Sequence, residues 1–176
     1  MTSFSENEYE MRWEKRFEAS KVIRKSLSEY PRGEVIYDEW HKTVIKDILD
    51  IYEERIRYGQ AQKWLNMTVK YLFVFDNILS ESQKKRLADV SIFLEETDVT
   101  KYKVPVDSYV MKACDLDKAF GPWSQMNDDQ YAKLQESLKK DFMWELENWV
   151  SIREKYKERE KKSYEAYYEK RIQEDM

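Results

Sequence analysis

The chain has 176 residues and a formal net charge of −4, from 31 Lys and Arg against 35 Asp and Glu. Its 41% hydrophobic and 15% aromatic residues are too many for a disordered chain, and its 38% charged residues are too many for a membrane protein. Three glycines and three prolines supply too few turns for an all-β sandwich or barrel. We therefore expect one compact all-α domain over 1–176, with about six to seven helices and a long charged C-terminal helix.

The net charge and the cysteine content limit which cellular compartments and which binding partners fit this sequence. The negative net charge attracts a polyanion poorly, so any contact with nucleic acid must be local. A single cysteine, Cys114, excludes an internal disulfide and every multi-cysteine zinc site. The segment Met1–Glu6 lacks the features of a signal peptide, and the longest strongly apolar stretch, Tyr71–Phe75, is too short to cross a bilayer. We expect a cytoplasmic protein with no membrane association.

The first part of the chain predicts three helices. Apolar residues recur at helical spacing from Ser5 to Tyr30, and Pro31 ends this pattern. A second helical pattern covers Tyr37–Ile56, and the short link between the two patterns indicates an antiparallel pair. A third helix, expected to be well buried, begins at Gly59 and ends near Ile78.

The middle of the chain predicts two more helices and a loop. Ser80 and Gln83 form a capping-box pattern at the start of a fourth helix, Ser80–Leu94. Residues 97–103 are interpreted as a loop. Pro105 is placed in the first turn of a fifth helix, which continues to Cys114.

The C-terminal part has a long helical pattern from Asn127, where Asn127 and Gln130 form another capping box. A break near Lys140-Asp141 is expected, because nearly fifty residues are long for one helix in a compact domain. Residues 151–176 are rich in Lys, Arg, Glu and Tyr and are interpreted as a charged helical extension in solvent. The alternative is a contact surface for a protein partner or for a second copy of this chain, since tyrosines among charges are typical of such surfaces.

The sequence lacks the residues that several kinds of functional site require. His41 is the only histidine, so a histidine-rich metal site is excluded, and we interpret His41 as a packing or surface residue. No Walker loop, dinucleotide fingerprint or EF-hand spacing is present, which argues against nucleotide-phosphate chemistry. Glu145 and Glu147 flank Leu146 in an aromatic-rich segment; we expect them to face solvent, and the alternative is that one is drawn inward. We expect neither a metal nor a cofactor.

Two short segments place an ionisable side chain at the start of a helix. Gly59-Gln60-Ala61-Gln62-Lys63 opens the third helix, and Val104-Pro105-Val106-Asp107-Ser108 opens the fifth. Unpaired backbone N–H groups make such positions locally positive. Lys63 and Asp107 can form an amine nucleophile with a carboxylate partner, or they can be ordinary residues at helix starts.

These segments resemble two motifs of the helix-hairpin-helix DNA glycosylases. Arg57-Tyr58-Gly59-Gln60-Ala61-Gln62-Lys63 is similar to the family's Leu-Pro-Gly-x-Gly-x-Lys hairpin, and Val104-Pro105-Val106-Asp107 is similar to its aspartate segment. The chain departs from the hairpin pattern at Arg57-Tyr58, which replaces Leu-Pro, and at Ala61, which replaces the second glycine. The separation between Lys63 and Asp107 is also longer than in the family.

The resemblance implies DNA as the partner and a nucleobase as the target. It makes Lys63 the nucleophile, Asp107 its charge-stabilising partner, and Gly59, Gln60 and Ala61 the residues that contact DNA. Enzymes of this kind extrude a base into a pocket, and aromatic residues are expected to line it; the candidates are Trp64, Tyr71 and Trp123. The alternative function is a non-catalytic helical module that binds a protein partner, or an inhibitor whose acidic surface imitates nucleic acid.

Overall fold

The computed structural model describes residues 6–31, 37–53 and 55–174, without the side chains of 6–10, 12, 86, 92 and 159–174. Within these ranges the chain is all-helical, as predicted, and contains no strand. It forms nine α-helices in the described part, more than the expected six to seven, because short helical turns occupy several segments between the long helices.

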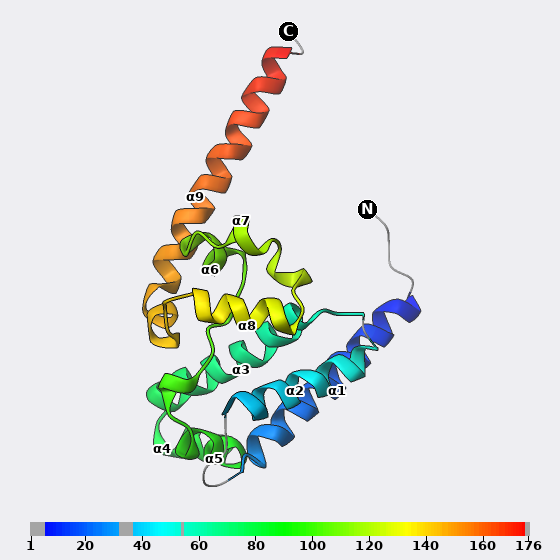
Figure 1. Ribbon diagram of the computed structural model, residues 1–176, viewed down its shortest axis with the longest axis vertical. Helices are drawn as coiled ribbons and strands as arrows, with labels where there is room; N and C mark the ends of the chain where they lie inside the picture. The colour runs from blue at the N-terminus through cyan, green and yellow to red at the C-terminus, as the bar shows by residue number, and fades with distance from the viewer. Residues whose placement is uncertain (1–5, 32–36, 54, 175–176) are drawn as a thin grey trace.

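The N-terminal half is built on three long helices (Figure 1): α1 (Glu6–Ser28), α2 (Tyr37–Tyr52) and α3 (Tyr58–Ile78). The predicted pairing of the first two is confirmed, since α1 packs along α2. Their shared face buries an aromatic cluster, in which the rings of Tyr30, Trp40 and Phe93 lie 5.0–5.2 Å apart. Each such side chain contributes about 1.5–3 kcal/mol through burial, which ties α1 and α2 to the helix that carries Phe93.

The predicted fourth helix is interrupted. The chain forms α4 (Glu81–Lys84), the 3-10 turn η1 (Lys85–Leu87) and α5 (Ala88–Glu96) in its place. The backbone leaves helical angles at Leu87, where φ is −106° and ψ is 8°, so the helix cannot continue through this point. The expected start is correct, because the Gln83 side-chain oxygen accepts the Ser80 backbone N–H at 3.0 Å.

The predicted start of the fifth helix was wrong by one turn. After the 3-10 turn η2 (Val99–Lys101), residues 102–107 have no regular secondary structure, and α6 begins at Ser108 (Ser108–Ala113). Asp107 is its N-cap and accepts hydrogen bonds from two backbone N–H groups of the first turn. Pro105 therefore lies before the helix, buried against the core.

A second apolar cluster fills the space between α6 and α8 (Asp128–Ser137), with Val106, Met111 and Leu134 among its buried members. The short helix α7 (Asp117–Phe120) and the 3-10 turn η3 (Trp123–Gln125) connect α6 to α8. Helix α3 contacts both η3 and α8, and Tyr58 at its start packs against both apolar clusters. Helix α3 thus packs against both apolar clusters.

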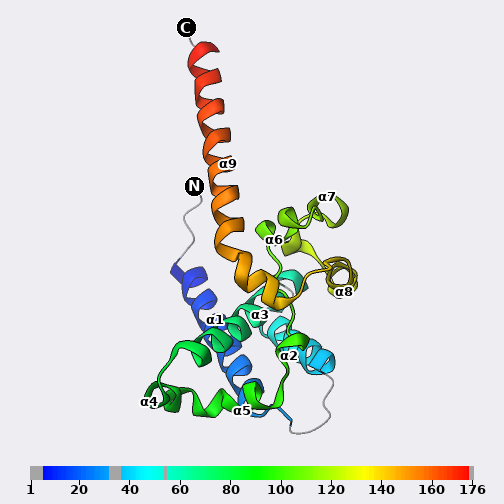
Figure 2. The same cartoon turned by 90° about the vertical axis from the view of Figure 1, so that its left-hand side faces the viewer.

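The last helix, α9 (Phe142–Glu174), starts after a break at residues 138–141, so the predicted interruption is confirmed. It leaves the body of the molecule and projects away from it (Figures 1 and 2). Ile152 and Tyr156 remain buried, and the Tyr156 ring lies 6.3 Å from that of Tyr109 on α6. The packed part of α9 therefore reaches beyond residue 151. Among the described helices, none combines the length and the apolar character that spanning a membrane requires.

Candidate active site around Lys63 and Asp107

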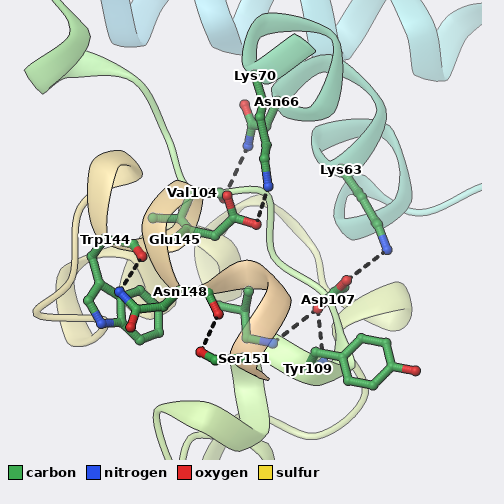
Figure 3. A network of polar contacts seen from close by, with 11 residues as sticks. Lys63, Asn66, Lys70, Val104, Asp107, Tyr109, Trp144, Glu145, Asn148 and Ser151 are labelled. Carbon is green, nitrogen blue, oxygen red and sulfur yellow. Dashed lines mark hydrogen bonds and ion pairs between the residues drawn. The ribbon is translucent and has the colours of Figure 1, made fainter. Parts of the chain in front are cut away.

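The structure brings Lys63 and Asp107 together, although they are 44 positions apart in the chain (Figure 3). Lys63 lies in the second turn of α3 and Asp107 caps α6. The Lys63 Nζ donates to Asp107 Oδ2 at 3.1 Å, and the two side chains are 32% and 5% exposed. The pair thus has one accessible partner, the amine, and one buried partner, the carboxylate.

Asp107 is held rigidly by the start of α6. Its Oδ1 accepts the backbone N–H groups of Tyr109 at 2.9 Å and Val110 at 3.0 Å, while Oδ2 faces Lys63. An aspartate N-cap stabilises a helix by about 1 kcal/mol, and the positive end of the helix dipole favours its charge. The resulting carboxylate is fixed in place and negatively charged next to the lysine.

Trp123 completes the surroundings of the amine. The Lys63 Nζ lies 4.9 Å from the centre of the Trp123 ring, a cation–π distance. The amine therefore sits between an indole face and a carboxylate. Trp64, in contrast, lines a separate hollow near α1, and Tyr71 is mostly exposed on α3.

The backbone N–H groups at the start of α3 form hydrogen bonds within the protein. The Gly59 N–H donates to Met126 O at 3.1 Å, and the N–H groups of Gln60 and Ala61 both donate to Arg57 O, at 2.9 and 3.2 Å. Gly59 and Ala61 are buried, and a Cβ added at Gly59 would lie 1.8 Å from the backbone oxygen of Trp123. Glycine is needed here for the close approach of η3, and these three N–H groups are already bonded inside the protein.

A second ion pair, which the sequence did not indicate, lies close to the first. Lys70 Nζ donates to Glu145 Oε1 at 2.8 Å, with side-chain exposures of only 6% and 1%. The expectation that Glu145 faces solvent was wrong, whereas Glu147 is exposed as predicted. Burial raises the pKa of Glu145, the Lys70 charge opposes this shift, and the negative charge of Asp107 adds to it. Figure 3 shows the two pairs near each other, with Lys63 and Lys70 extending from the same helix.

Lys70 belongs to a row of polar side chains on the buried face of α3. Gln62, Asn66 and Lys70 follow one another at intervals of four residues, so they lie on one side of the helix, and all three are buried. In the sequence, these polar residues recur every four positions among the apolar residues of the same helix face. This spacing is the signal that could have revealed the buried polar row.

The polar row positions the segment that carries Asp107. Gln62 Nε2 donates to Val106 O at 3.0 Å, and Asn66 Nδ2 contacts the Val104 carbonyl at 3.4 Å. Asn66 Nδ2 also donates to the Tyr131 hydroxyl at 2.9 Å, which links α3 to α8. Since buried polar groups are costly to leave unpaired, these bonds fix the path of residues 104–106 relative to α3.

His41 is a packing residue, as predicted. It is buried on α2, and its Nε2 lies 2.8 Å from Asn66 Oδ1. Burial lowers the pKa of His41 to about 4, so the ring is neutral at pH 7 and its Nε2–H is the donor in this bond. No group of three or more His, Cys, Asp or Glu residues in the described part of the chain is arranged to hold a metal ion.

Comparisons with family models, with curated proteins and with solved structures gave no match to this chain. The helix-hairpin-helix resemblance therefore depends on the two sequence segments alone.

Proposed function

We propose that this protein acts on a nucleobase in DNA through Lys63 and Asp107. The observation that supports this function most directly is the 3.1 Å contact between the Lys63 amine and a buried, capped carboxylate 44 residues away. Lysines that attack sugars need a neighbouring group that handles a proton, and aspartates next to them stabilise positive charge on the sugar. The Trp123 ring at 4.9 Å from the amine offers an aromatic face for a base.

The reaction would proceed by displacement at the C1′ carbon of the deoxyribose. Asp107 takes a proton from the Lys63 ammonium group, and the freed lone pair of Nζ attacks C1′. The bond between C1′ and the base breaks, its electron pair leaves with the base, and the base takes the proton from Asp107. When the bond between C1′ and the ring oxygen then breaks, that oxygen takes a second proton from Nζ, and an imine between Lys63 and C1′ remains.

The imine gives a direct test, because borohydride reduces it to a stable amine. The full-length protein is incubated with duplexes that contain uracil, oxidised bases, alkylated bases or an abasic site, in the presence of borohydride, and cross-linked DNA is measured on a denaturing gel. We expect an adduct with at least one duplex, its loss in Lys63→Ala and its retention in Lys133→Ala, an exposed lysine on α8. Failure to trap any duplex, including the abasic one, would refute the nucleophilic role, as would equal trapping by Lys63→Ala.

A protein-interaction module is the second candidate, favoured by an exposed apolar row on α3. Tyr71, Phe75 and Ile78 are 51%, 43% and 68% exposed, and their spacing puts them on one helix face. Rows of this kind often contact another helix. Light scattering after size exclusion, at high protein concentration, should show a dimer that becomes monomeric in Tyr71→Ser/Phe75→Ser if a second copy covers this row; a monomeric wild-type protein would exclude that partner.

A further inference from the structure

A hollow between α1 and the start of α3 gathers positive charge in an otherwise acidic protein. Its volume is about 580 Å³, within the range of small-ligand sites. The hollow is lined by three cations, two large aromatic residues and three others: Lys15, Arg16, Arg55, Tyr52, Trp64, Met11, Ile56 and Gln60. No acidic residue is among these lining residues.

The aromatic wall is formed by two helices. The Tyr52 ring at the end of α2 and the Trp64 ring on α3 lie 6.2 Å apart at an angle of 65°. Both side chains are half-buried, so part of each ring faces the hollow. Aromatic faces of this kind stack against planar bases of any sequence.

The cations differ in how strongly the protein already holds them. Lys15 Nζ donates to Ile51 O at 2.7 Å and to the exposed Glu53 at 3.0 Å, and Arg55 lies 4.0 Å from the same carboxylate. Glu53 thus lies within ion-pair distance of both Lys15 and Arg55. Arg16 forms no ion pair with any side chain that the structure describes. Burial raises the pKa of Tyr52, and the nearby charge of Arg16 opposes this shift.

Among the described residues, Glu53 offsets only one of the three cations, so two positive charges remain beside two aromatic rings. This arrangement matches a ligand that is planar at one end and anionic at the other. A guanidinium group binds phosphate through paired N–H donors, and Arg16 and Arg55 are both exposed, so their donors are accessible to a ligand. We propose that this hollow binds a nucleotide, with the base against Tyr52 and Trp64 and the phosphate next to Arg16 and Arg55.

The nucleotide can come from two sources, a free mononucleotide or one residue of a DNA strand. The site does not require a Walker or dinucleotide motif, because side chains rather than a glycine-rich loop supply the contacts. It is also separate from the Lys63 site: Lys63 lines neither this hollow nor the larger one between α2 and α8. An experiment can therefore refute nucleotide binding in this hollow without refuting the proposed reaction of Lys63, and the reverse is also true.

Calorimetry and tryptophan fluorescence on the full-length protein test the proposal, with 5′-AMP, 5′-GMP, adenosine, inorganic phosphate and a single-stranded pentanucleotide as probes. We expect AMP or GMP to bind at least about tenfold more tightly than either adenosine or phosphate, because base and phosphate contacts add. Arg16→Ala should weaken binding by about tenfold, and Arg55→Ala should do the same. Lys25→Ala, a matched exposed cation on α1, should leave it unchanged.

The same probes distinguish a free nucleotide from one residue of a DNA strand. Binding of the pentanucleotide that is tighter than that of AMP and falls with salt supports a site for a DNA strand, while equal or weaker binding supports a free nucleotide. The proposal is overturned if no probe binds at millimolar concentration, if phosphate alone binds as tightly as AMP, or if folded Arg16→Ala and Arg55→Ala both bind as the wild type does.

Discussion

Replacing Lys70 by methionine should destabilise the protein strongly, because it removes the partner of a buried carboxylate. Glu145 is 1% exposed, its Oε1 accepts only from Lys70 at 2.8 Å, and its Oε2 has no hydrogen-bond partner in the described structure. Breaking a buried ion pair on one side typically costs about 3–5 kcal/mol. For a chain of this size, that loss corresponds to a fall in Tm of roughly 6–20 °C.

The pH dependence gives the sharper part of this prediction. Burial raises the pKa of Glu145 in the folded protein, so its protonated form is favoured by folding and its contribution to stability falls as pH rises through that pKa. Lys70 opposes the shift, and its removal should raise the pKa further. The loss in Lys70→Met should therefore be largest near pH 7 and shrink on acidification towards pH 4.5.

Urea unfolding of the wild type, Lys70→Met, Glu145→Leu and the double variant at pH 7 and pH 4.5 measures both effects. The double variant should recover to within about 1 kcal/mol of the wild type, because replacing a buried pair by apolar residues is often neutral. A Lys70→Met variant that is destabilised by less than 1 kcal/mol at pH 7, or equally at both pH values, would refute this reasoning.

Three further predictions concern single residues. Gly59→Ala should lower stability by about 1–3 kcal/mol in urea unfolding, since its Cβ would meet the Trp123 backbone oxygen at 1.8 Å; an unchanged midpoint would contradict the close approach. Asp107→Ala should cost about 1–2 kcal/mol and Asp107→Asn less, because asparagine keeps an N-cap acceptor; equal losses would argue against the capping role. His41 should titrate near pH 4 by NMR, because burial favours its neutral form. The folded protein should therefore lose up to about 3 kcal/mol of stability as the pH falls from 6.5 to 4. A titration midpoint near 6.5 would contradict the burial of His41.

The helices and their order follow from local features of the sequence. Apolar spacing and capping residues such as Asn127 act within a few positions, so they predict α1, α2, α3 and α8 well. The start of α6 was misplaced because proline and aspartate both favour a helix start. In the structure Asp107 caps the helix through the N–H groups of Tyr109 and Val110, and Pro105 lies before it.

The two ion pairs differ in how far the sequence could predict them. The segments that carry Lys63 and Asp107 resemble two motifs of one family, and this resemblance led to the expectation that the two side chains meet. Glu145 alternates with apolar residues in the same way as exposed Glu147, and the residue that turns it inward is Lys70, which is 75 positions away. A buried charge depends on its partner, and a partner so distant leaves no local pattern.

The most direct test of the central claim is the identity of the lysine that reacts with DNA. After borohydride trapping with an abasic duplex, the cross-linked protein is digested and the modified peptide is identified by mass spectrometry. Modification at Lys63 alone is the predicted result. Adducts spread over exposed lysines, or none at Lys63, would contradict the assignment of Lys63 and Asp107 as the reactive pair.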